Sequence, residues 1–161
     1  MATITKKLTK NASNRLGAAP WGNMAAFTYK LETNSSGAVI GSDAAQGSST
    51  PAGTVIRVGI LPAGFKLVDF KATVGTAMTT TITADVGFAY VDGVDDSSVP
   101  QDADYFVAAG ATTVGVLRQA TTVPQVTLPK DAWLTVTTAV AANAKASSIE
   151  LIVLAVAEGV K

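Results

Sequence analysis

The sequence contains no cysteine and no histidine. The missing thiols exclude disulfides and cysteine nucleophiles, and the missing imidazoles exclude Ser-His dyads and histidine-based pH sensing. The same two absences exclude zinc sites with nitrogen or sulfur ligands, and metal enzymes whose ligands are histidines. Any chemistry must therefore use carboxylates, lysines, tyrosines or hydroxyl groups.

The sequence also lacks an excess of one charge, and it lacks long apolar runs. Twelve basic residues balance twelve acidic ones, which argues against a general nucleic-acid coat protein. The longest apolar stretch, Ile149 to Ala157, is interrupted by Glu150 and has about half of the ~20 residues that a membrane-spanning helix needs. Lys6 and Lys7 are not followed by an apolar segment, as they would be in a secretory signal. We therefore expect neither a nucleic-acid nor a membrane partner.

The residues that are abundant favour β-structure. Of 161 residues, 28 are Ala, 21 are Thr and 19 are Val. Thr and Val are β-branched and prefer strands, and Ala allows a thin, tightly packed core. A chain of this length suits one domain.

Apolar and polar residues alternate along most of the chain after residue 23, as they do in half-buried strands. The pattern predicts eight or nine strands, drawn from residues 27–31, 38–41, 54–61, 65–74, 81–91, 105–109, 114–118, 123–128, 133–140 and 149–158. The last of these strands looks buried on both faces. The fold class predicted is all-β, an antiparallel β-sandwich. Its expected core includes Phe70, Val74, Ile82, Val86, Phe88, Leu134, Val136, Leu151 and Val153.

Residues 1–23 are predicted to form an extended N-terminal arm, and residues 24–161 a single β-sandwich domain. The arm has four basic residues, no acid and no strand period. We expect it to act in assembly and to add little to the core, whereas a solvated tail is the alternative. The large ring of Trp21 argues against a purely solvated tail. The residues expected to bind a partner are Lys6, Lys7, Lys10, Arg15, Leu16 and Trp21.

The loop from Asp92 to Asp104 holds five acids in 13 residues. Such carboxylates could bind Ca²⁺, but their spacing matches no EF-hand or nonapeptide repeat. A hydrated turn is the simpler interpretation, so we expect no obligatory metal site. A glycosidase would also need aromatic side chains on which the sugar can stack, and the chain has only ten aromatic residues. Phosphate-binding glycine loops are absent from the sequence. We therefore predict no catalytic residue, no metal and no cofactor.

Four stretches of the chain resemble tailed-bacteriophage capsid decoration (cement) or minor head proteins. The first is Val58-Gly-Ile-Leu-Pro-Ala-Gly-Phe-Lys-Leu-Val-Asp-Phe-Lys-Ala-Thr-Val74. The others are Thr79-Thr-Thr-Ile-Thr-Ala-Asp-Val-Gly87, Asp-Ala-Asp-Tyr-Phe-Val-Ala-Ala at 102–109, and Val126-Thr-Leu-Pro-Lys-Asp-Ala-Trp-Leu-Thr-Val-Thr137. The resemblance extends from Phe27 to the end of the chain.

This resemblance implies a jelly-roll-like virion structural protein that is not an enzyme. Such a protein is made in the host cytoplasm and lies on the outer surface of the head. It clamps neighbouring copies of the major capsid protein, and it forms a homodimer or homotrimer. A phage tail, fibre or other receptor- or carbohydrate-binding module is the alternative, favoured if exposed aromatic rings line a groove. An enzyme is a third class, which needs the acids of 92–104 to converge with Lys or Tyr in one cleft.

Overall fold

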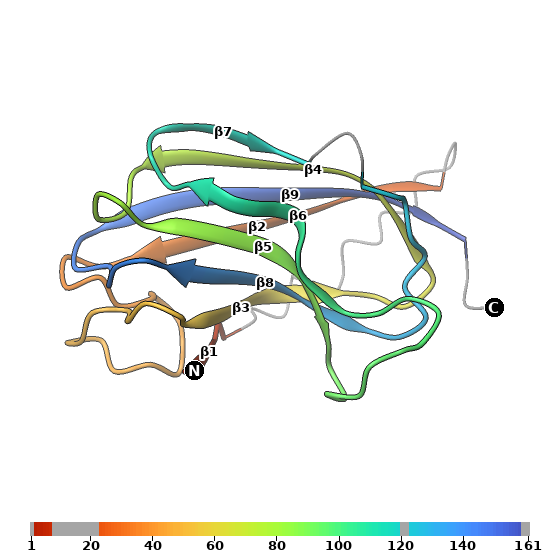
Figure 1. Cartoon of the computed structure of the whole chain (residues 1–161), viewed down its shortest axis with the longest axis horizontal. Coiled ribbons are helices and arrows are strands. Elements are labelled where there is room, and N and C mark those ends of the chain that lie inside the picture. The colour runs from red at the N-terminus through yellow and green to blue at the C-terminus, as the bar shows by residue number, and fades with distance from the viewer. Residues whose placement is uncertain (1, 8–22, 120–122, 159–161) are drawn as a thin grey trace.

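In the computed structural model, two β-sheets pack face to face (Figure 1). The structure describes residues 2–7, 23–119 and 123–158. These residues form no helix, and so none that could cross a membrane. The described strands are β1 (Thr3–Thr5), β2 (Met24–Thr33), β3 (Val55–Leu61), β4 (Phe65–Thr76), β5 (Thr83–Tyr90), β6 (Asp102–Ala111), β7 (Gly115–Arg118), β8 (Ala132–Ala139) and β9 (Ser147–Ala157).

The strand order places distant parts of the chain side by side. One sheet has the order β1-β3-β8-β5-β6 and the other has β2-β9-β4-β7. All strand pairs are antiparallel except β1 with β3, which is parallel. Without β1, each sheet has four strands, an arrangement compatible with an eight-stranded jelly roll. The predicted all-β sandwich is confirmed.

The alternating pattern of the strands puts their apolar residues between the two sheets. In β9, Leu151 lies opposite Tyr29 of β2 and Ala72 of β4, and all three side chains are buried. All nine residues predicted for the core are buried, which confirms that choice of strand faces. The prediction that β9 is buried on both faces was wrong, because outward-facing Ile152 and Leu154 are only half-buried.

Aromatic rings join the two layers near the centre of the core. Phe70 of β4 stacks on Phe106 of β6, with ring centroids 4.9 Å apart. Tyr105 makes edge contacts with both Phe106 and Phe88, at 4.9 and 5.3 Å. Because these rings come from both sheets, they hold the two layers in a fixed relation.

The N-terminal residues take part in the sheet, contrary to the expectation that residues 1–23 add little to the core. Thr3–Thr5 pairs in parallel with residues 55–57 of β3, and Ile4 is buried, with 8% of its surface exposed. A three-residue strand is too short for its alternation to stand out in the sequence, and its partner lies some fifty positions away along the chain. The division at residue 23 stays a prediction, because residues 8–22 lie outside the described part.

Deletion of residues 1–7 is expected to lower the free energy of unfolding. Burying one Ile side chain is worth about 1.5–3 kcal/mol, and the deletion also removes the hydrogen bonds of β1 to β3. Urea unfolding of the full chain, the deletion and Thr3→Ala, which changes an exposed residue, measures the effect. An unfolding curve of the deletion that superimposes on that of the full chain would contradict this role of β1.

Candidate assembly surfaces

The structure describes two of the six residues predicted to bind a partner. The Lys6 ammonium donates a hydrogen bond to the backbone carbonyl of Lys30, and partial burial lowers its pKa, opposed by the charge of Glu32. Lys7 is exposed and follows β1 at the edge of the five-stranded sheet. The other predicted partner-binding residues, Lys10, Arg15, Leu16 and Trp21, lie outside the described residues.

The carboxylates of the loop after β5 hold its backbone in place. Asp95 accepts hydrogen bonds from the backbone N–H groups of Asp96 and Gln101, at 2.9 and 2.7 Å. Asp92 accepts from the N–H of Val94 at 3.0 Å and pairs with the Lys130 ammonium at 3.1 Å. These bonds, the Val94 N–H first and Lys130 second, lower the pKa of Asp92. The described residues contain no cluster of three potential metal ligands.

Chelation is therefore expected to leave the melting temperature unchanged. The Asp92 and Asp95 carboxylates are already satisfied by N–H groups and an ammonium, so a cation would add little. Thermal unfolding in excess EDTA, compared with added Ca²⁺, tests this expectation. A fall of several degrees in EDTA that Ca²⁺ reverses would make the loop a structural cation site.

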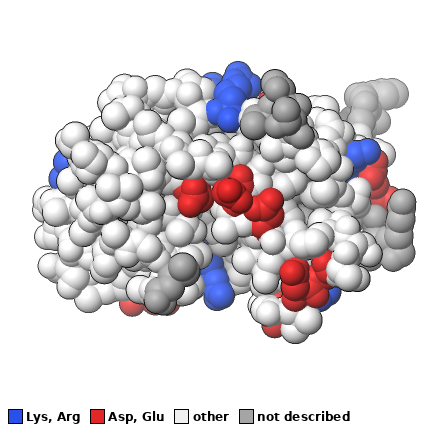
Figure 2. Space-filling view, viewed as in Figure 1, with Lys and Arg blue, Asp and Glu red and all other residues white. Residues whose placement is uncertain are grey.

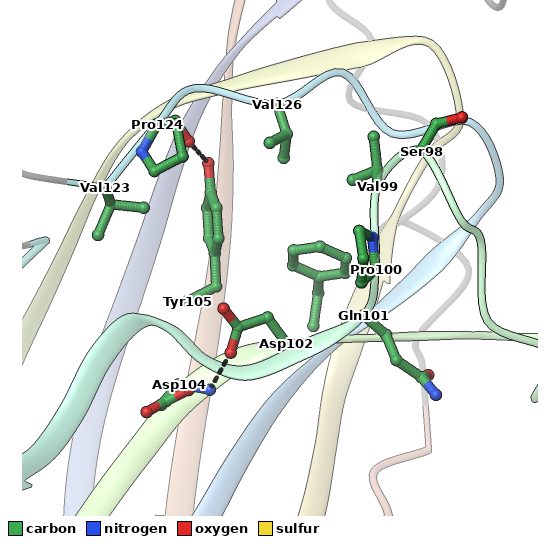
Figure 3. A pocket seen from close by; sticks show the side chains of 11 residues that line it. Ser98, Val99, Pro100, Gln101, Asp102, Asp104, Tyr105, Val123, Pro124 and Val126 are labelled. Carbon is green, nitrogen blue, oxygen red and sulfur yellow. Dashed lines mark hydrogen bonds between the residues drawn. The ribbon is translucent and has the colours of Figure 1, made fainter.

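A groove of about 610 Å³ lies beside this loop. Residues 98–102, Asp104 and Tyr105 line one side, and Val123, Pro124 and Val126 line the other (Figure 3). Phe88 also lines the groove. We call it the acidic groove, because Asp102 and Asp104 form part of one wall. Its remaining lining is largely apolar.

A bulge in β6 places the two carboxylates. Between the pairs Val86–Val107 and Phe88–Asp102, the register of β5 and β6 shifts. Gly87 lies between these pairs, and a Cβ there would lie 2.0 Å from the backbone oxygen of Asp102. The absence of a side chain at Gly87 therefore lets β6 approach β5 closely beneath the groove.

Negative charge in the acidic groove is not neutralised within the described structure. Neither Asp102 nor Asp104 forms an ion pair with the residues described. The pKa of Asp104 is raised, first by its hydrogen bond with the Asp102 side chain and second by the negative charge of Asp102. Figure 2 shows acidic side chains gathered in two groups on the visible face, one near its centre and one over the loop that follows β5.

A second candidate surface is apolar and lies where β6 turns into β7. Val114 and Val116 are exposed over 69% and 54% of their surface. We call the exposed apolar residues of β6, β7 and the turn between them the β6–β7 patch: Ala108, Ala109, Ala111, Val114 and Val116. In the order of the sheets, β6 and β7 are both edge strands, so their backbones are available for further pairing. Exposed apolar patches often mark interaction sites.

The described aromatic residues do not form an exposed platform for a sugar. Trp133 is half-buried under the Arg57 guanidinium, which lies 5.7 Å from its ring centroid, and the other described aromatics are buried. Tyr105 does share the groove with Asp102 and Asp104, as an enzyme would require. However, its hydroxyl donates to the Pro124 carbonyl at 2.7 Å, and burial raises its pKa, so it holds its proton.

Sequence reasoning missed the groove. The sequence predicts a hydrated turn over 92–104, whereas β6 begins at Asp102, and Asp102 lines one groove together with a segment that follows residue 122. The spacing of Asp102 and Asp104 was an available signal, because residues two apart in a strand share a face. The opposite wall depends on long-range packing and leaves no local pattern.

Comparison with solved structures shows a shared fold. A chain from the capsid of Ralstonia phage GP4 matches with a TM-score of 0.62 and 20% identity, over 99% of this chain and all of that one. A chain of the cyanophage Pam1 capsid asymmetric unit matches with a TM-score of 0.55 and 16% identity, over 84% of this chain and 85% of that one. No protein-family model and no curated protein matches the sequence.

Proposed function

We propose that this chain is a non-enzymatic structural protein of a bacteriophage head. The observation that carries the proposal is the match to the GP4 capsid chain, which covers 99% of this chain and all of that one. The chemistry of the described residues agrees with this role, because the three tyrosine hydroxyls and the Asp92 and Asp95 carboxylates take part in structural hydrogen bonds.

Within the head, we propose that the protein decorates the outer surface and clamps neighbouring major capsid subunits. Such a protein binds a shell that has already formed, so it needs exposed contact surfaces and no catalytic turnover. The β6–β7 patch supplies an apolar surface whose removal from water on binding is favourable. The basic residues of 1–23 supply a second contact, toward a partner surface that is acidic.

Sedimentation with purified phage parts tests this function. Heads lacking the protein are mixed with it, pelleted and heated, in parallel with isolated tails. We expect the protein to pellet with heads, to leave tails unbound, and to raise the temperature at which heads release their DNA. Binding to tails but not heads would favour the fibre or receptor-binding alternative and overturn the proposal.

Charge placed in the β6–β7 patch is expected to weaken head binding. Burial of one Val side chain is worth about 1.5–3 kcal/mol, and each 1.4 kcal/mol is about a tenfold change in Kd. The double variant Val114→Asp, Val116→Asp should therefore bind heads at least about tenfold more weakly. Val94→Asp is the matched control, because Val94 is also exposed but lies in the loop after β5. Equal head binding by both variants would exclude the patch as the shell contact.

A further inference from the structure

Opposite charges are concentrated in two separate parts of this neutral chain. Residues 83–111, which span β5, β6 and the loop between them, contain six acids and no Lys or Arg. Residues 1–23 contain four basic residues and no acid. In a neutral protein, two such segments of opposite charge make one copy electrostatically complementary to another.

The fold puts the described start of the basic segment and the acidic strand β6 at opposite edges of one sheet. β1, which leads into Lys7, forms one edge of the five-stranded sheet, and β6, which carries Asp102, forms the other. Four strand spacings of about 4.8 Å separate the two edges by roughly 19 Å. The basic edge of one molecule can therefore face the acidic edge of a second molecule.

The acidic groove has the composition that a long basic side chain requires. Lys and Arg lay their methylene stems along apolar surface and keep the charged head at a polar site. In the groove, Val99 and Pro124 offer apolar surface, and the Asp102 and Asp104 carboxylates lie together at one side (Figure 3). These two carboxylates have no cationic partner among the described residues. A bound cation would also relieve their mutual repulsion.

We propose that the acidic groove binds Lys or Arg side chains from the N-terminal basic segment, residues 7–15, of a second copy of this chain. The inference deepens the proposed function by naming the acidic partner surface that this segment contacts. Each copy then gives one basic segment and receives another. Because the contact joins two different surfaces, the assembly closes as a symmetric ring when the rotation between copies allows it.

Charge reversal on each side, alone and together, tests the pairing. Self-association of the full chain is measured by sedimentation velocity over a range of concentration and salt. The groove variant is Asp102→Lys, Asp104→Lys, and the segment variant is Lys7→Glu, Lys10→Glu, Arg15→Glu. Lys6 is kept because its ammonium already binds the Lys30 carbonyl. Glu150→Lys, on the exposed face of β9, is the control for a charge reversal outside the groove.

We expect each reversed variant to self-associate about tenfold more weakly and the combined variant to recover. The wild-type association should also weaken as salt rises, since screening acts over about 8 Å at physiological ionic strength. Asp102→Asn with Asp104→Asn, which preserves side-chain shape, gives the same weakening if the lysine variant fails to fold. Circular dichroism checks folding.

Two outcomes would overturn the inference. The first is a wild-type chain that stays monomeric at all concentrations, because then no second copy occupies the groove. The second is additive loss in the combined variant, because genuine pairing predicts recovery. These measurements contain no heads, so they can fail while head binding succeeds. A self-associating protein that ignores heads would instead refute the proposed function alone.

Discussion

Replacement of Phe70 or Phe88 by alanine is expected to lower the free energy of unfolding by about 3–5 kcal/mol each. Neither side chain has more than 1% of its surface exposed. Phe70 stacks on Phe106 across the two sheets, and Phe88 contacts Tyr105. Truncation therefore loses the transfer energy of a ring and leaves a cavity that the surrounding strands cannot close.

Urea unfolding, followed by circular dichroism, measures this loss. Val116→Ala is the control, because more than half of that side chain is exposed and surface substitutions usually stay within about 0.5 kcal/mol. A loss below about 1 kcal/mol at both phenylalanines would mean that the rings do not hold the sheets together.

The strand faces could be predicted because burial in a sandwich follows a local rule. Residues two apart share a face, so the alternation around Ile82, Val86 and Phe88 determined which side chains point inward. The prediction that β9 is buried on both faces was wrong at Ile152 and Leu154, which are apolar but face outward. A continuous apolar run does not distinguish a strand buried on both faces from one with an exposed apolar face.

Pairing between distant segments explains most of the differences between the predicted and the observed strands. The stretches 38–41 and 123–128 had strand-like composition, yet each contributes only an isolated bridge, Thr33 with Val39 and Lys66 with Thr127. β1 became a strand because β3 offers it a free edge. Whether a short β-branched segment forms a strand depends on such an edge, and local sequence does not report it.

The candidate groove was hidden for the same reason. The sequence showed five acids between Asp92 and Asp104 without separating their roles. In the structure, Asp92 and Asp95 fix the loop backbone, whereas Asp102 and Asp104 line a cavity. The distinction depends on the bulge opposite Gly87 and on the segment 123–126, neither of which has a local signature.

Gly37→Ala is the second substitution with a large expected effect, a loss of about 2–5 kcal/mol. Gly37 has a φ of +84°, which costs an L-residue about 1–2 kcal/mol. A Cβ there would lie 1.9 Å from the backbone oxygen of Asn143. Overpacking of this kind adds about 1–3 kcal/mol, because rigid backbone cannot move aside as a flexible side chain can.

That clash is costly because Asn143 is buried and its side chain makes hydrogen bonds to other segments. Its amide donates to the Thr33 hydroxyl at 3.0 Å, and its side-chain oxygen accepts from the Thr79 N–H at 3.0 Å. Displacement of Asn143 would weaken both hydrogen bonds, and a buried polar group that loses its partner costs about 1–3 kcal/mol. The clash therefore strains the hydrogen bonds that connect the end of β2 to the segments around Thr79 and Asn143.

Gly41→Ala separates the clash from the backbone strain. Gly41 has a φ of +70°, but a Cβ there would have no neighbour within 4 Å. This control should lose only about 1–2 kcal/mol, the cost of the left-handed conformation alone. Thermal and urea unfolding of both variants measure the difference, which belongs to the contact with Asn143. If the two variants lose the same stability, the close approach of Gly37 to Asn143 contributes nothing, and the turn tolerates a side chain at that position.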